Sequence, residues 1–194
     1  MMTTTSEAES KRFNRLSCLI IILARLIVYS NTIHSSFHFD DSAFVDDPLT
    51  RDLHNIPRFF QENDISLPSR GLATTSLAVN YYFSGLSVEG YHWTNISTHL
   101  MNGVLVYFLM LIILGEYVSG GGAAGPDGDI NRTRVLAPFV ALLFITSPIQ
   151  THSVTYIIKR HAPMASFFYL LSLLLFIRAV VAMASGCTPM WEVC

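Results

Sequence analysis

Long apolar segments constrain the fold of this chain more than any other feature. Inside a lipid bilayer the backbone must satisfy its own hydrogen bonds, so an apolar run of about 20 residues crosses as a helix. Four such runs are present, at residues 16–33, about 93–114, 135–147 and about 162–181. The third is short, and we expect its neighbours to extend it or the segment to enter obliquely. The pattern predicts an all-α integral membrane protein with about four transmembrane helices.

Composition supports this class and argues against others. Only 13% of the residues are charged and 51% are hydrophobic, whereas soluble domains contain about 25% charged residues. The net charge of −2 and the lack of a basic stripe argue against nucleic acid as a partner. The three cysteines, Cys18, Cys187 and Cys194, are too few for a disulfide framework. No cluster of histidine and cysteine in the sequence predicts a metal site.

Basic residues predict the orientation of the first helix. Lys11, Arg12 and Arg15 precede it, which is typical of a signal anchor whose amino terminus stays in the cytoplasm. No clean small-residue cleavage site follows the segment, so we expect it to be retained. Arg25 lies within the segment, and we expect its charge to face protein or to reach the membrane interface.

This orientation divides the chain into regions. We expect a cytoplasmic segment at residues 1–15, a membrane region at residues 16–181 and a short tail at residues 182–194. Within the membrane region, residues 34–92 form a long outer loop. Residues 115–134 form a cytoplasmic linker rich in glycine, without apolar periodicity.

The outer loop combines helical periodicity with a polar motif. Apolar residues recur at helical spacing near residues 53–60 and 72–83, which predicts two amphipathic helices on the outer membrane surface. Asp40 and Asp41 directly follow the first apolar segment. Carboxylates at a membrane surface are costly unless they are solvated, paired or used, so this pair is either a solvated turn or a candidate general base. Asp46 and Asp47 are expected instead to shape a turn and the entry to a helix.

Three motifs occur in a particular order: FDDSAFVDDPLTRDLHNIPRFF, SRGLATTSLAVNYYFSGLSVEGYHWTNISTHLMN and TSPIQTHSVTYIIKRHAPMASFFYLLSLLLFIRA. In this order and spacing, residues 29–179 resemble the amino-terminal membrane region of the TMTC group, the transmembrane and tetratricopeptide-repeat proteins. That group is related to the protein O-mannosyltransferases of the GT-C glycosyltransferase superfamily. The resemblance implies a partial GT-C-like architecture at residues 16–181. It also implies transfer of a sugar, such as mannose, from a polyprenyl or dolichyl phosphate to protein hydroxyls.

The resemblance further implies roles for individual residues. Asp40 and Asp41 occupy the position of the family's catalytic acidic pair. Five other positions match the family pattern and are expected to bind substrate: Arg70, His92, Asn95, His99 and Arg160. Arginine suits a departing phosphate because the guanidinium presents a planar fork of donors. The resemblance implies no metal, and no cofactor beyond the lipid-linked sugar itself.

Alternative explanations exist for three of these residues. His92 and His99 lie about two helical turns apart and so share a helix face. This spacing fits either a joint polar site or hydrogen bonds between helices. Arg160 fits an anchor at the membrane interface equally well.

Several positions depart from the family pattern. Ser147 and Gln150 stand where the family has histidines, and His152 and Ala162 stand where it has acidic residues. Gly71 replaces a proline that follows the matching arginine. The family's later membrane helices and its tetratricopeptide repeats are not found in these 194 residues. These departures bear on activity more than on the membrane architecture.

Three functional hypotheses follow. The first is a GT-C-like glycosyltransferase, as a fragment or a shortened member. The second is a non-catalytic small membrane subunit or scaffold of a larger complex derived from such an enzyme, and the third is a truncated product without activity. The expected location is the endoplasmic reticulum membrane in a eukaryote or the plasma membrane in a bacterium.

The expected partners are membrane lipid, a lipid-linked sugar and a protein acceptor. Other membrane subunits or a second copy are expected as well, because polar residues within membrane helices need partners. In the family arrangement such residues would face later helices. The residues concerned are Arg25, His92, Asn95 and His99.

Overall fold

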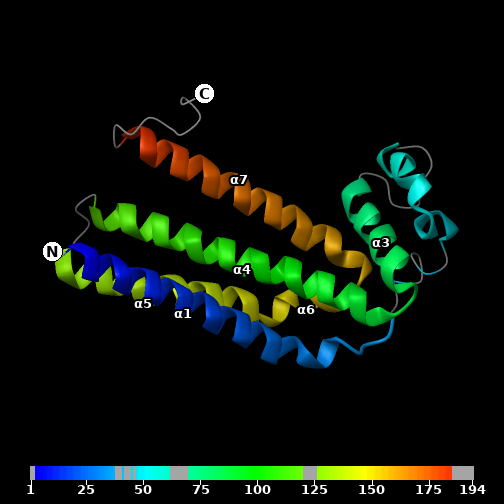
Figure 1. The fold of residues 1–194 in the computed structure, drawn as a ribbon, viewed down its shortest axis with the longest axis horizontal. Coiled ribbons are helices and arrows are strands. Elements are labelled where there is room, and N and C mark those ends of the chain that lie inside the picture. The colour runs from blue at the N-terminus through cyan, green and yellow to red at the C-terminus, as the bar shows by residue number, and fades with distance from the viewer. Residues whose placement is uncertain are drawn as a thin grey trace. The chain divides into compact units, whose positions relative to one another are not determined.

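The computed structural model describes residues 3–37, 41, 45, 47–61, 70–119 and 126–184. Its α-helices are α1 (Thr3–Tyr29), α3 (Gly71–Ser84), α4 (Val88–Ser119), α5 (Pro126–Thr146), α6 (Thr151–Thr155) and α7 (His161–Ala184) (Figure 1). Its 3-10 helices are η1 (Ser30–Thr32), η3 (Pro48–Arg51), η4 (Leu53–Phe60), η5 (Pro148–Gln150) and η6 (Ile158–Arg160). The described residues contain no β-strand, and for this part of the chain the all-α prediction is confirmed.

Among the described residues, three helices are long and apolar enough to cross a membrane. They are Lys11–Thr32, Val88–Glu116 and Ile158–Ala184. They correspond to the first, second and fourth apolar segments of the sequence, and they indicate an integral membrane protein. The third segment forms a shorter apolar helix, Val135–Thr146, which is the last part of α5. Three of the four predicted spans therefore coincide with helices that have the length and composition to cross, and the count of four stays a prediction.

The expected linker and the outer loop both contain helix. α4 continues to Ser119 and α5 begins at Pro126, so both helices extend into residues 115–134. Proline is tolerated at the first helical position because its missing N–H needs no partner there. In the outer loop, η4 and α3 form where periodicity predicted helices. Their location on the membrane surface stays a prediction.

The chain divides into two compact units. Unit 1 consists of residues 1–24, 100–146 and 167–194, and unit 2 consists of residues 25–99 and 147–166. Helices α1, α4 and α7 each contribute one part to each unit. Each unit has a core of its own.

The core of unit 1 joins α1, α4 and α5, which run alongside one another (Figure 1). Its buried residues are Ile21, Tyr107, Ala137, Ala141 and Ile145. A small residue permits a close approach, since a Cβ atom on Gly103 would collide with the side chain of Ile145. The Tyr107 hydroxyl donates a hydrogen bond to Asn14 Oδ1 at 2.9 Å, which ties α4 to α1.

The core of unit 2 places the outer loop against α4 and the residues before α7. Its buried apolar residues form two clusters: Leu77, Tyr91, Ile157 and Ile158 in one, and Tyr29, Ile96 and Val154 in the other. η4 packs on the start of α3, where a Cβ atom on Gly71 would lie 2.5 Å from the backbone oxygen of Phe59. A residue with a Cβ atom would force η4 and α3 apart. Gly71, a departure from the family pattern, is therefore part of this contact.

Candidate functional site

A buried arginine organises the polar interior of unit 2. Arg160, in η6, is 1% exposed. Its Nη1 donates to Asn80 Oδ1 at 2.6 Å and to Ser76 Oγ at 3.2 Å, both on α3. Its Nη2 donates to the backbone oxygen of Tyr91 at 3.3 Å, and the guanidinium carbon lies 5.7 Å from the Tyr91 ring centroid. Arg160 therefore joins α3, α4 and η6, and it is not an exposed anchor at the interface.

The Asn80 amide is held at both of its polar atoms. Oδ1 accepts from Arg160, while Nδ2 donates to Thr94 Oγ1 at 3.0 Å and to the backbone oxygen of Gly90 at 3.4 Å. Because each atom has a partner of the required type, a flipped amide would lose all three hydrogen bonds. The carbonyl dipole of Asn80 is thereby fixed toward the buried guanidinium charge.

Asp41 lies beside this network. It is 1% exposed, and its Oδ1 accepts a hydrogen bond from the backbone N–H of Ile158 at 2.9 Å. Its charge also interacts with that of Arg160. A buried carboxylate near a buried guanidinium offsets part of the desolvation cost of both groups. Asp41 is therefore an integral part of the interior and not a solvated turn residue, while Asp40 lies outside the described residues.

Arg70 has a more accessible environment. It directly precedes α3, and its backbone oxygen accepts hydrogen bonds from the backbone N–H of Thr74 at 2.9 Å and from Thr74 Oγ1 at 3.2 Å. The residue is half-buried. Its charge acts on His161, the first residue of α7. Of the two arginines predicted to bind phosphate, Arg70 keeps part of its surface accessible and Arg160 does not.

Two polar residues of α4 bind backbone groups of neighbouring segments. The ring of His92 makes a hydrogen bond through Nε2 to the backbone oxygen of Ser35 at 2.9 Å. Asn95 Nδ2 donates to the backbone oxygens of Val154 at 3.3 Å and Tyr156 at 3.2 Å, at the end of α6. Both side chains are fully buried. These two residues therefore have hydrogen-bond partners within this chain, and the expectation that they also face further helices stays a prediction.

Arg25, Tyr29 and His99 form a second group in unit 2, here called the Arg25 cluster. The Arg25 guanidinium carbon lies 3.3 Å from the Tyr29 ring centroid. The His99 ring meets the same tyrosine edge-on, with 6.4 Å between ring centroids. Although His92 and His99 share a face of α4, these contacts connect them to different neighbours. A desolvated cation–π contact stabilises by about 2 kcal/mol, but it provides no acceptor for the N–H groups of the guanidinium.

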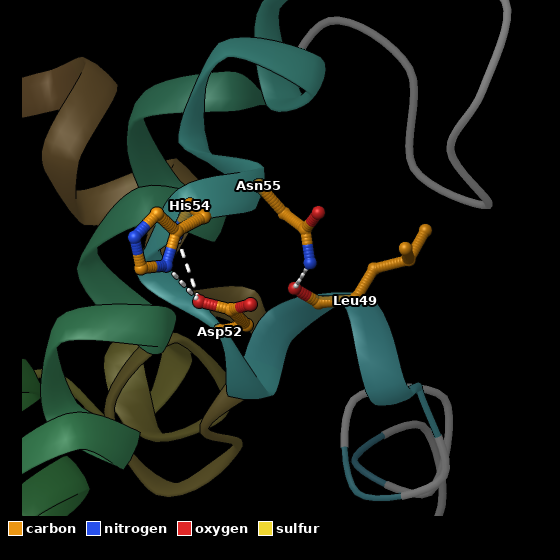
Figure 2. Close-up of polar contacts among 4 residues, drawn as sticks. All are labelled: Leu49, Asp52, His54 and Asn55. Atoms are coloured by element: carbon orange, nitrogen blue, oxygen red, sulfur yellow. Dashed lines mark hydrogen bonds and ion pairs between the residues drawn. The ribbon is translucent and has the colours of Figure 1, made fainter.

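Acidic residues further along the loop have local structural roles. Asp47 caps the start of η3, and its Oδ1 accepts from the backbone N–H of Leu49 at 2.9 Å, as predicted, while Asp46 lies outside the described residues. Asp52 begins η4 and accepts from the backbone N–H of His54 at 2.9 Å and from His54 Nδ1 at 2.8 Å (Figure 2). These hydrogen bonds, the backbone one first, lower the pKa of Asp52. Asn55 Nδ2 closes the turn by donating to the backbone oxygen of Leu49 at 3.1 Å.

Sequence reasoning missed three participants in these networks, Tyr29, Asn80 and Tyr91. Asn80 carried a usable signal, since an amide within the apolar stretch LAVNYYF needs a partner if it is buried. Tyr29 lies four residues after Arg25, a spacing that places both on one helix face. Tyr91 contributes a backbone oxygen, which sequence does not reveal. Among the described residues, no group of three or more His, Cys, Asp or Glu side chains is arranged to hold a metal ion.

Comparisons with known proteins give a distant similarity to one group. The chain is 25% identical over 194 residues to protein O-mannosyl-transferase Tmtc3 of Drosophila melanogaster, which covers 92% of this chain and 20% of that protein. It is 27% identical over 164 residues to protein O-mannosyl-transferase TMTC2 of Homo sapiens, which covers 79% of this chain and 18% of that protein. No family model and no solved structure matches. The chain thus spans about a fifth of the length of the curated relatives it matches, and it is distantly similar to the protein O-mannosyl-transferases.

Proposed function

We propose that this chain is a membrane glycosyltransferase, or a region of one, that moves a sugar from a polyprenyl or dolichyl phosphate to protein hydroxyls. Mannose is the proposed sugar. The observation that carries the proposal is the similarity of most of the chain to proteins named protein O-mannosyl-transferases. Three helices suited to crossing a membrane support a donor that is itself a lipid.

The acidic pair is proposed to supply the base. The acceptor hydroxyl must lose its proton as its oxygen bonds to the anomeric carbon, and a carboxylate within hydrogen-bond reach takes that proton. Asp40 is the proposed base. Asp41 is buried and bound to the backbone N–H of Ile158, so its proposed role is to hold the pair in place. The bond from the anomeric carbon to the phosphate oxygen breaks in the same displacement, and polyprenyl phosphate leaves.

The two arginines predicted to bind phosphate are proposed to have different roles. Arg70 is partly accessible, so its planar fork is available for the departing phosphate. Arg160 is fully buried, and it already donates hydrogen bonds to Asn80, Ser76 and the Tyr91 backbone oxygen. Its proposed role is to hold α3 and Asp41 in position. The buried polar residues of α4 are proposed to shape the floor of the same site: His92, Asn95 and His99.

Transfer of labelled mannose tests the proposal. Sealed membranes that contain the protein are incubated with dolichyl phosphate [³H]mannose and an acceptor protein. Label is expected on serine or threonine hydroxyls. Asp40→Asn is expected to lower the rate by about 100-fold or more because it removes the general base. Asp52→Asn is the matched control, since Asp52 caps η4, and it is expected to retain transfer. Unchanged transfer in Asp40→Asn would remove this residue from the mechanism.

A non-catalytic membrane subunit is a second candidate function. One observation favours it: α7 presents large apolar side chains that the described residues leave exposed, including Phe168, Tyr169, Leu175 and Phe176. Lipid or a helix of another subunit would cover such a face. Stable copurification of a second membrane protein, together with no mannose transfer by the complex, would favour this function over the first.

A further inference from the structure

Arg25 is a buried charge whose donors are not satisfied by the described residues. The side chain is fully buried, and Nε, Nη1 and Nη2 have no hydrogen-bond partner within that part of the chain. Arg160 contrasts with it, since both of its Nη atoms are hydrogen bonded. The Tyr29 ring attracts the Arg25 charge but accepts none of its N–H groups in the plane of the guanidinium. Five donors shielded from water therefore favour an anionic partner.

Asn95 supplies a complementary group next to the Arg25 cluster. Its Nδ2 donates to the backbone oxygen of Val154, whereas its buried Oδ1 has no hydrogen-bond partner among the described residues. Val154 packs in one apolar cluster with Tyr29 and with Ile96, the chain neighbour of Asn95. Arg25 thus contacts Tyr29 directly, and Asn95 bonds the backbone of Val154, which packs in the same apolar cluster as Tyr29. A ligand that matches both carries an anionic group and a hydroxyl.

The two residues also lie at similar depth. Arg25 precedes Thr32, the end of the first apolar span, by seven residues, and Asn95 follows Val88, the start of the second, by seven residues. At 1.5 Å per residue, each lies roughly 10 Å along its helix from the end that the outer loop connects. The hydrocarbon layer is about 30 Å thick, so this level lies below the surface of the bilayer. An anion incurs a desolvation cost to reach this level, which the Arg25 charge offsets in part, and a lipid chain already holds the anion at the membrane.

We propose that Arg25, together with Asn95 of the proposed substrate site, binds the headgroup of a lipid phosphate ester in addition to the contact proposed for Arg70. The choice of a polyprenyl phosphate as this ester rests on the proposed function. The guanidinium fork pairs with two phosphate oxygens while the Tyr29 ring supports its plane. Asn95 Oδ1 accepts a hydrogen bond from a protonated phosphate oxygen or from a hydroxyl of the attached sugar. Because both side chains are buried, neighbouring side chains move apart as the lipid enters, and the bound headgroup is shielded from water.

Binding of farnesyl phosphate to the purified full chain in nanodiscs tests the site. A ligand that binds the folded state raises the melting temperature in proportion to its occupancy. Farnesyl phosphate is expected to raise it, whereas farnesol, which lacks the phosphate, and inorganic phosphate, which lacks the lipid, are expected to leave it unchanged. An equal rise in melting temperature with inorganic phosphate would show that the site binds a free anion and does not require the lipid. An equal shift with farnesol would show that the phosphate is not recognised.

Variants of Arg25 assign the binding to this residue. Arg25→Gln is expected to weaken farnesyl phosphate binding at least tenfold, because it removes a charge-assisted bidentate pair. Arg178→Gln, at an exposed arginine of α7, is the matched control and is expected to bind as the unaltered chain does. If Arg25→Gln does not fold, Arg25→Lys replaces it as the test. Lysine keeps the positive charge but lacks the planar guanidinium, so it is expected to bind farnesyl phosphate more weakly. An affinity equal to that of the unaltered chain would overturn the proposal.

Mannose transfer measured on the same samples separates this inference from the proposed function. Farnesyl phosphate binding that depends on Arg25, without any transfer by the unaltered chain, supports the site and counts against the activity. Transfer that persists in Arg25→Gln, with unchanged farnesyl phosphate binding, supports the activity and overturns the site.

Discussion

Arg160 and Arg25 illustrate two ways in which a helical membrane protein buries an arginine. Arg160 is surrounded by acceptors from two helices, and the Asp41 charge lies nearby. Arg25 lies on an aromatic face and retains its hydrogen-bond donors. The first arrangement connects helices because its acceptors belong to both α3 and α4. The second arrangement contacts the Tyr29 ring and leaves the guanidinium N–H groups available to a ligand.

The Asn80–Arg160 contact is expected to contribute measurably to stability. Asn80→Ala removes the acceptor of the shortest Arg160 hydrogen bond and leaves a buried donor unsatisfied, which costs about 2–3 kcal/mol of unfolding free energy. Reversible unfolding in bicelles measures this loss. Asn31→Ala, at an exposed asparagine in η1, is the control and is expected to change the free energy by less than about 0.5 kcal/mol.

A double variant tests whether the two residues act as a pair. Asn80→Ala combined with Arg160→Met removes the donor and the acceptor of this hydrogen bond together, so neither is left unsatisfied by the loss of the other. The combined loss of unfolding free energy is therefore expected to be smaller than the sum of the two single losses. Strict additivity would show that the hydrogen bond between them contributes nothing.

The Asp52–His54 contact predicts a local pH dependence. The pKa of Asp52 is lowered from its ordinary value of 3.8, first by the hydrogen bond from the backbone N–H of His54 and then by the one from its ring (Figure 2). A lowered pKa in the folded state means that the carboxylate favours η4 above the unfolded pKa. This contribution is lost as the pH falls through the lower, folded value. The effect stays local and small because both side chains are exposed.

Titration of the Asp52 carboxyl carbon by NMR in micelles checks this prediction. His54→Ala removes the ring donor but keeps the backbone donor. The pKa of Asp52 is therefore expected to rise only part of the way toward 3.8. A return to the ordinary value in this variant would contradict the order of the two causes.

At the scale of elements, two glycines of α4 are expected to respond oppositely to the same change. A Cβ atom on Gly103 would collide with Ile145 of α5, a branched side chain that cannot move aside without shifting its helix. Gly103→Ala is therefore expected to cost about 1–3 kcal/mol. Gly115 has open space around its Cβ position, so Gly115→Ala is expected to stabilise by up to about 1 kcal/mol.

Thermal unfolding of both variants compares these effects within one helix. Ile145→Ala removes the methyl group that the alanine side chain at position 103 would meet. The double variant Gly103→Ala with Ile145→Ala is therefore expected to lose less stability than the sum of the two single variants. Equal effects of alanine at positions 103 and 115 would show that α4 and α5 do not pack through Gly103.

Length and apolar periodicity predicted the helices of this chain better than their ends or their contacts. The spans now formed by α1, α4 and α7 were visible as long apolar runs because lipid exposure demands them. The helical start of α5 was not, since its first turns are polar and follow a glycine-rich stretch. Site residues were predicted where a family pattern exists, as for Asp41 and Arg160. Asn80 is the partner of Arg160, and its apolar surroundings in the sequence indicate only that it needs a partner. Which partner it has depends on contacts with α4 and η6 that the local pattern does not specify.

At the scale of the whole molecule, contacts within unit 2 bear on the number of membrane crossings. Residues of η6 contact Asp41 of the outer loop and Tyr91 at the start of α4. Within unit 2, the start of α7 therefore lies beside the start of α4. If α4 crosses the bilayer, α7 begins again at the end where α4 began, so we expect the chain between Ser119 and His161 to return across the membrane. α5 is the helix available for this return.

The dimensions of α5 fit this role. It contains 21 residues, which corresponds to roughly 31 Å at 1.5 Å per residue, against a hydrocarbon thickness of about 30 Å. Only its last part, Val135–Thr146, is strongly apolar. Ala137 and Ala141 pack in the core of unit 1, so one face of this part of α5 is covered by protein. A smaller surface therefore remains to contact lipid. We therefore expect α5 to be the fourth crossing.

Cysteine accessibility in sealed vesicles tests the fourth crossing. The natural cysteines are replaced by serine, and single cysteines are introduced at exposed positions: His54→Cys, Glu116→Cys and Thr151→Cys. An impermeant maleimide is expected to label positions 54 and 151 from one side and position 116 only from the other. Labelling of 116 and 151 from the same side would mean that α5 does not cross. The start of α7 would then lie across the bilayer from the outer loop, so the hydrogen bond between Asp41 and Ile158 could not form. The test therefore decides the topology and the integrity of the polar interior together, because one arrangement requires the other.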